Sequence, residues 1–360
     1  MFEIHRPSPF VDLAAVEAWD AWFRWREKAV LHDFSIEDTW RRVSDVLASI
    51  ESCGEATTWR TRFTDALASW RLLPDERLLA GAGTGRITRG DGVLHACLNA
   101  AGFVCLEPAI DASMDLAALG DCAALAVRAL DNAALQANIA APHLRIGMIG
   151  VADALALLGL RYDSDSGRLQ AAAMGRAIAE GCLRGSIMLA AERGPCGHET
   201  HASMERARLR GLPDALLRDA AHHGVRHPQL TALTSQPRLA LLANDVADAV
   251  DPLRGKNHTD VISASDGQRT TVRSSGYALN ILHAGGMEPD GTPDTLPDIS
   301  WMAQIKMRAA MQPWIDEPID YPLLVTNDLG EVQRIEARKL AATHELSDPV
   351  WRDAVEVQSP

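Results

Sequence analysis

The sequence has no long apolar run and no excess of positive charge, and each absence excludes a class of protein. The longest apolar stretches, such as residues 154–160, are far shorter than the ~20 residues of a membrane-spanning helix. Aspartate and glutamate number 48 against 35 lysines and arginines, so the formal net charge of −13 disfavours a nucleic-acid partner. Residues 1–10 lack the cationic start and apolar segment of a secretory signal. We therefore expect a cytoplasmic protein with neither a membrane nor a nucleic-acid partner.

Closely spaced cysteine pairs are also absent. The six cysteines are scattered and none belongs to a Cys-x-x-Cys motif, so a disulfide framework is not expected. What is present, 47% apolar residues with 26 glycines and 18 prolines, is typical of an ordinary globular chain with a large core. The 360 residues allow two domains or one large domain.

Apolar periodicity divides the chain into three parts. We expect an N-terminal helical region over residues 1–72, a domain over residues 73–325 and a peripheral tail over residues 326–360. Ser35, followed by Glu37 and Asp38, predicts a capped helix start. The early tryptophans fall at helical spacing, which favours packing over a ligand cage. Further helices are expected at 116–135, 169–191 and 299–315, short strands at 230–233 and 260–263, and a glycine-rich junction at 73–111.

Seven short blocks in the chain carry a family signal. They are residues 73–84, 126–132 (AVRALDN), 145–153 (RIGMIGVAD), 157–164, 192–195, 230–243 and 311–316. In this order they resemble the large catalytic subunit of ribonucleotide reductases, most closely the adenosylcobalamin-dependent class, over about residues 30–325. The resemblance implies adenosylcobalamin as a cofactor and a nucleotide as a ligand.

The departures from this family are as informative as the matches. Its members build a ten-stranded α/β barrel around a hairpin with an Asn-x-Cys-x-Glu motif, whose cysteine becomes a radical. This chain is too short for that barrel, and the missing length falls between residues 84 and 125. We therefore expect a mostly α fold with a reduced α/β sheet, a cut-down relative of the ribonucleotide reductase ten-stranded barrel.

The candidate catalytic residues are Cys97, Cys105 and Glu107, and two alignments compete. In the preferred one, residues 94–97 (Leu-His-Ala-Cys) resemble the family's Leu-Ser-x-Cys, whose thiol helps to reduce the substrate. In the other, Cys105-Leu106-Glu107 is a remnant of Cys-x-Glu, which places thiol and carboxylate on one side of a strand. The third interpretation is that these are buried, inert thiols beside a solvated glutamate.

The family's phosphate-binding turn is altered. Where relatives have Pro-Thr-Gly-Thr, this chain has Ser235-Gln236-Pro237-Arg238, so a proline without an N–H replaces the glycine that approaches the phosphate. Ser235 and Arg238 remain as candidate ligand-binding residues for an anion. No cysteine follows Cys196, so the mobile pair that recharges the family's active site is also missing.

A metal site is the other candidate. Cys196, His198 and His201 lie within six residues, and thiolate with imidazole suits Zn²⁺ or Fe²⁺. The spacing matches no known finger signature, which leaves an ordinary loop as the alternative.

Three functions follow from these features, and they leave open whether the chain is an enzyme. The first is a non-reducing protein that binds a nucleotide or a partner. The second is a repurposed enzyme that uses Cys97, Cys105 and Glu107, or a metal at residues 196–201. The third, less favoured, is a working cobalamin-dependent reductase. Because an incomplete barrel leaves strand edges and apolar faces open, we also expect a homodimer.

Overall fold

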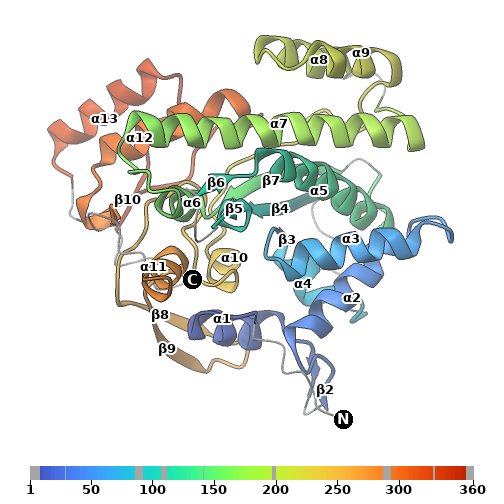
Figure 1. Ribbon diagram of the computed structural model, residues 1–360, viewed down its shortest axis with the longest axis horizontal. Coiled ribbons are helices and arrows are strands. Elements are labelled where there is room, and N and C mark those ends of the chain that lie inside the picture. The colour runs from blue at the N-terminus through green and yellow to red at the C-terminus, as the bar shows by residue number, and fades with distance from the viewer. Residues whose placement is uncertain are drawn as a thin grey trace.

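The computed structural model describes residues 9–28, 30–85, 92–106, 112–140, 142–196, 200–286, 293–326 and 329–353. This part of the chain is mostly helical, with several small sheets and no closed barrel (Figure 1). None of its helices is both long enough and apolar enough to cross a membrane. The expectation of a mostly α fold with a reduced sheet is therefore confirmed at this level.

The N-terminal helices form where their caps and apolar faces predict them. They are α1 (Leu13–Ala18), which continues into a π-helical turn (Trp19–Phe23), α2 (Ile36–Ala48) and α3 (Ala56–Ala68), with the short strands β1 (Arg26–Glu27) and β2 (Val30–Leu31) between them. At the start of α2 the Asp38 carboxylate accepts the backbone N–H of Ser35 at 3.0 Å, as the predicted cap requires. Trp19 and Trp40 are buried and join the main core, which extends over elements from residue 19 to residue 321.

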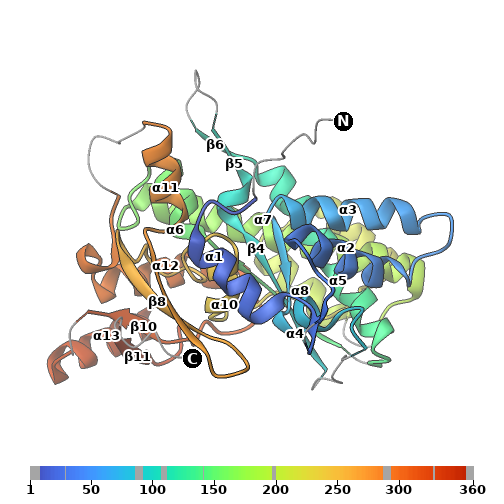
Figure 2. The same cartoon turned by 90° about the horizontal axis from the view of Figure 1, so that it is seen from below.

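A three-stranded sheet lies at the centre of the molecule. Its order is β3 (Leu72–Pro74), β4 (Val93–Asn99) and β7 (His143–Ile149), with β3 antiparallel and β7 parallel to β4. The predicted strand at 230–233 is reduced to one parallel bridge, in which Thr231 pairs with Ile146 of β7. The short pair β5 (Val104–Cys105) and β6 (Ser113–Met114) stands away from this sheet (Figure 2).

Two long helices cover the sheet. Helix α5 (Leu116–Gln136) lies between β4 and β7 in the chain. Helix α7 (Asp165–Arg193) follows α6 (Val151–Leu157) and packs on α5 (Figure 1). Glycines let α5 and α7 touch closely, since a Cβ on Gly181 would lie 2.1 Å from the carbonyl oxygen of Gly120. The hairpin of α8 (Thr200–Leu209) and α9 (Asp214–His223) packs on the outer side of α7.

The remaining elements pack below and beside the sheet. They are α4 (Glu76–Gly81), α10 (Pro237–Leu242), the hairpin β8 (His258–Ser263) and β9 (Arg269–Ser274), α11 (Tyr277–Ala284), α12 (Trp301–Met311), β10 (Leu323–Val325), α13 (Glu331–Thr343) and β11 (Trp351–Asp353). Parallel strands β10 and β11 tie the tail to the body, and Ala337 and Ala341 of α13 are buried against Ile305 and Leu323. Within residues 329–353, β11 and α13 thus contact β10 and α12.

Candidate functional site

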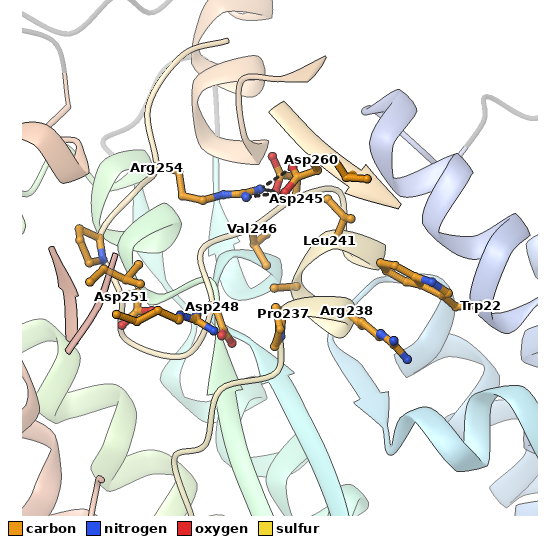
Figure 3. Close-up of a pocket in the computed structure, with 15 residues that line it drawn as sticks. Trp22, Pro237, Arg238, Leu241, Asp245, Val246, Asp248, Asp251, Arg254 and Asp260 are labelled. Atoms are coloured by element: carbon orange, nitrogen blue, oxygen red, sulfur yellow. Dashed lines mark hydrogen bonds and ion pairs between the residues drawn. The ribbon is translucent and has the colours of Figure 1, made fainter. Parts of the chain in front are cut away.

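A cavity of about 120 Å³ lies between α10, residues 245–254 and strands β8, β10 and β11; we call it the α10 pocket (Figure 3). Charged side chains line it from opposite sides. Asp245, Arg254 and Asp260 meet at one end, Asp248 and Asp251 lie at another, and Arg238 and Trp22 lie at a third. Apolar residues between them come mainly from α10 and its neighbours. The pocket therefore combines apolar walls with several ionisable groups.

At the first end the charges neutralise one another. Arg254 binds both Asp245 and Asp260, with Nη1 2.7 Å from Oδ1 of Asp260, and His258 Nε2 lies 2.7 Å from Oδ2 of Asp245. Burial opposes ionisation of Asp245, but Arg254 and His258 hold the pKa of its carboxyl well below the ordinary range. Burial likewise works against a charged His258, yet the hydrogen bond to Asp245 raises its pKa. Two anions and two cations make this end a closed ion cluster.

The altered turn that was predicted to contact an anion is filled from within the chain. Ser235 Oγ donates to Oδ2 of Asp248 at 2.6 Å, and the backbone N–H of Gln236 donates to Oδ1 at 2.7 Å. Burial raises the pKa of the Asp248 carboxyl, and these two hydrogen bonds work in the opposite direction. At this turn, Ser235 Oγ and the Gln236 N–H are thus already used by a carboxylate of the chain itself.

Arg238, the second residue predicted at this turn, points to the other side of the pocket. Its guanidinium carbon lies 5.0 Å from the centre of the Trp22 ring, and Nη1 is 3.5 Å from Oε2 of Glu76. The turn therefore separates Ser235 and Arg238, which sequence spacing had grouped into one anion site.

Two further charged residues of the pocket, Asp251 and Arg352, have little or no pairing. Asp251 is 4% exposed, and the nearest charged nitrogen, Nη2 of Arg308, lies 3.6 Å from its Oδ1. Burial, reinforced by Asp248, raises the pKa of Asp251 to about 7 against the pull of Arg308. Arg352 on β11 makes no side-chain hydrogen bond or ion pair within the part of the chain that the structure describes, and its Nε is buried without a partner.

Of the three predicted catalytic residues, the structure describes Cys97 and Cys105, which lie on different strands. Cys97 lies in the middle of β4, between Leu73 of β3 and Gly147 of β7, and is 3% exposed. Burial, and then the nearby carboxylates, raise the pKa of its thiol far above the ordinary range, so a neutral thiol is held there. Cys105 is exposed on β5, in register with Ser113, and Glu107 lies outside the described residues.

The predicted metal loop is described only at its edges. Cys196 and His201 are exposed on either side of residues 197–199, which include His198 and lie outside the described part. Among the described residues, the three potential ligands that do lie together are Asp245, His258 and Asp260. Arg254 already binds both carboxylates there, so this group behaves as an ion cluster rather than as a metal centre.

Two of the family-like blocks meet in a buried ion network instead of at a reactive centre. Asp131 of α5 accepts from Arg226 Nε at 2.7 Å and from His227 Nε2 at 2.9 Å, and it also pairs with Arg193 at the end of α7. Burial acts to raise the pKa of Asp131, but His227 and the two arginines keep this pKa far below its usual range. One helical turn before Asp131, Arg128 binds Glu51 at 3.0 Å. These blocks therefore join α2, α5, α7 and the segment after α9.

Apart from Arg238, sequence reasoning missed the charged residues that line the α10 pocket. Asp248 and Asp251 follow α10 without any recognised motif, Arg352 lies in a segment that looked peripheral, and Trp22 was interpreted as packing. The one available signal was the spacing of three aspartates at 245, 248 and 251, which has no meaning until the chain between them is known to turn around a cavity.

Comparison with known proteins identifies one matching region. Residues 95–263 match the family model described as the barrel domain of ribonucleotide reductase, while no curated protein matches the chain. The matched stretch begins inside β4, includes Asp131 and Asp248, and ends at β8, so Arg352 lies beyond it. This region is therefore similar to the barrel domain of a ribonucleotide reductase large subunit.

Proposed function

We propose that this chain is a ribonucleotide-reductase-like protein that does not reduce ribonucleotides and instead binds a small molecule in the α10 pocket. The observation that carries this proposal is Asp248, whose carboxylate accepts from Ser235 and from the backbone of Gln236. A nucleotide phosphate placed there would meet a carboxylate instead of free donors, and two like charges at one turn repel. The nucleotide ligand predicted from the resemblance is therefore disfavoured at this turn.

The described thiols do not fit adenosylcobalamin, the cofactor that the resemblance implies. A radical formed on a cofactor needs a thiol within its reach, but Cys97 is 3% exposed inside the core and Cys105 lies on an exposed two-stranded pair. We therefore propose no step through this cofactor. The thiols of β4 and β5 serve packing and surface roles in this account.

The α10 pocket supports binding because some of its polar groups lack close hydrogen-bond partners within the described part of the chain. A buried or half-buried charge without a partner costs stability, so such groups in a cavity are typical of a site that a ligand completes. The buried Nε of Arg352 has no hydrogen-bond partner, and Asp251 lies 3.6 Å from Arg308, whereas the charges at the Arg254 end pair at 2.7 Å.

Nuclear magnetic resonance on the full chain tests this proposal. The indole N–H of Trp22, assigned through Trp22→Phe, reports on the mouth of the pocket. We expect small organic fragments to shift this signal, and we expect ADP, GDP, CDP and UDP at millimolar concentration to leave it and the Ser235 and Gln236 amides unchanged. Micromolar binding of a nucleoside diphosphate with shifts at residues 235–238 would contradict the proposal.

We also propose a homodimer, because an incomplete barrel leaves strand edges that a second copy could cover. In the described part, β3 ends the central sheet on one side, and a single bridge at Thr231 ends it on the other. Light scattering at micromolar concentration should give twice the monomer mass of 38.9 kDa. A mass equal to that of the monomer would remove this part of the account.

A further inference from the structure

We propose that the ligand of the α10 pocket is a small organic carboxylate, held by the guanidinium of Arg352 with its apolar body against α10. This inference rests on the proposed function and adds the chemical class of the ligand. The pocket supports it through the donors and acceptors that remain unused along its wall.

Most acceptors in the pocket are already occupied. Asp245 and Asp260 both bind Arg254, and Asp248 binds Ser235 and the backbone of Gln236 through its two oxygens. A cationic ligand would have to share each of the three carboxylates with these internal donors. The occupied acceptors thus disfavour an amine.

The unused hydrogen-bonding capacity belongs to arginine. Arg352 lines the pocket, and its Nε is buried without a hydrogen-bond partner; the carboxylates of Asp248 and Asp251 feel its charge, but no hydrogen bond joins its side chain to the described residues. A guanidinium presents its donors as a planar fork that matches the two oxygens of a carboxylate. Arg238 at the mouth, 40% exposed and 3.5 Å from Glu76, adds a second positive charge along the path of an entering anion.

Asp251 is the remaining carboxylate, and its surroundings set the pH dependence of binding. The groups that face it are Arg308 of α12, Arg352 of β11, Tyr321 and, on its own segment, Asp248, with Tyr162 nearby. With its pKa raised to about 7 by burial, Asp251 is largely neutral below that pH and then repels no anion. Carboxylate binding should therefore weaken as the pH rises from 6 to 8.

The walls fit the apolar part of such a ligand. Pro237 and Leu241 of α10, Val246 after it and Leu324 of β10 line the cavity between the charged ends. A cavity of about 120 Å³ suits a compact apolar body. An acid with a single ring or a short branched chain matches this space.

Three probes of one shape and different charge test the class of ligand. Benzoate, benzamide and benzylamine are titrated into the full chain at pH 6 and pH 8, with the Trp22 indole N–H as the readout. We expect benzoate to bind at least tenfold more tightly than the other two, and more tightly at pH 6. Arg352→Gln should weaken benzoate at least tenfold and Arg352→Lys less, whereas Arg218→Gln, an exposed arginine on α9, should have no effect.

The outcomes separate this inference from the proposed function. If benzylamine binds more tightly than benzoate, or if Arg352→Gln binds benzoate unchanged, the carboxylate class is wrong although the pocket still binds small molecules. If neither these probes nor a mixed set of anionic, neutral and cationic fragments shifts Trp22, the proposed function fails as well.

Discussion

Two groups of charged residues in this molecule differ in how completely they are paired. Around Asp131, charged side chains from α5, from the end of α7 and from the segments after α2 and α9 bind one another directly, and the side chains of Arg128, Asp131 and Glu51 have almost no exposure. In the α10 pocket, the buried Nε of Arg352 has no hydrogen-bond partner in the described part, and Asp251 lies 3.6 Å from Nη2 of Arg308. Complete pairing indicates a structural role, since nothing is left for a ligand, and incomplete pairing beside a cavity indicates binding.

Asp131→Asn should have the largest effect, because it leaves Arg193, Arg226 and His227 without their common carboxylate. Breaking a buried ion pair by removing one partner costs about 3–5 kcal/mol. Urea unfolding measures the loss, and the matched control is Asp121→Asn, an exposed aspartate on the same helix that pairs with Arg184. Similar stability of both variants would show that the Asp131 network is not a structural one.

Gly181→Ala tests how tightly α5 and α7 pack against each other. The added methyl would lie 2.1 Å from the Gly120 carbonyl oxygen, so α5 and α7 must separate. Overpacking of this kind costs about 1–3 kcal/mol, or more where backbone opposes it. Calorimetric unfolding should show the loss, whereas Gly54→Ala, with nothing within 4 Å of the new Cβ, should unfold like the parent. A Gly181→Ala protein as stable as the parent would contradict the close helix contact.

The α10 pocket should make stability depend on pH through Asp251. The pKa of Asp251 is raised by burial to about 7, so its contribution to stability is present below about pH 4 and is lost as the pH rises through about 7. Between pH 5 and pH 8, the free energy of unfolding of the parent should fall by on the order of 2 kcal/mol because of Asp251, since one pKa unit corresponds to about 1.4 kcal/mol. The Asp251→Asn variant should not show this fall.

Chemical unfolding at each pH measures this slope. Asp214→Asn, an exposed aspartate at the start of α9, is the control and should keep the parental slope. The Asp131 carboxyl has a lowered pKa and titrates below this window, so its network does not obscure the result. An unchanged slope in Asp251→Asn would show that this carboxyl is ionised throughout.

The smallest effect is expected at the rim of the paired network. Glu192 binds Arg128, but its side chain is 46% exposed and Arg128 keeps Glu51 as a second partner. Exposed pairs contribute about 0.2–1 kcal/mol, so Glu192→Gln should cost no more than about 0.5 kcal/mol in urea. A loss comparable to that of Asp131→Asn would move the boundary of the network to the surface.

The sequence predicted the helices well because caps and apolar periodicity are local. The cap at Ser35 and the helices later found at α5 and α7 needed only neighbouring residues. The glycine-rich junction concealed β4, because a buried central strand has no alternating pattern to mark it. The pocket could not be foreseen, since Arg352 reaches it through the pairing of β11 with β10 and Asp248 through a turn around α10.

The central claim is that this chain, although similar to a reductase barrel domain, does not reduce ribonucleotides. The most direct measurement incubates the full chain with labelled ribonucleoside di- and triphosphates, adenosylcobalamin and a dithiol, and quantifies deoxyribonucleotides by chromatography. We predict no product above that of a sample without protein. Deoxyribonucleotide that forms in proportion to the protein and disappears in Cys97→Ser would contradict the account.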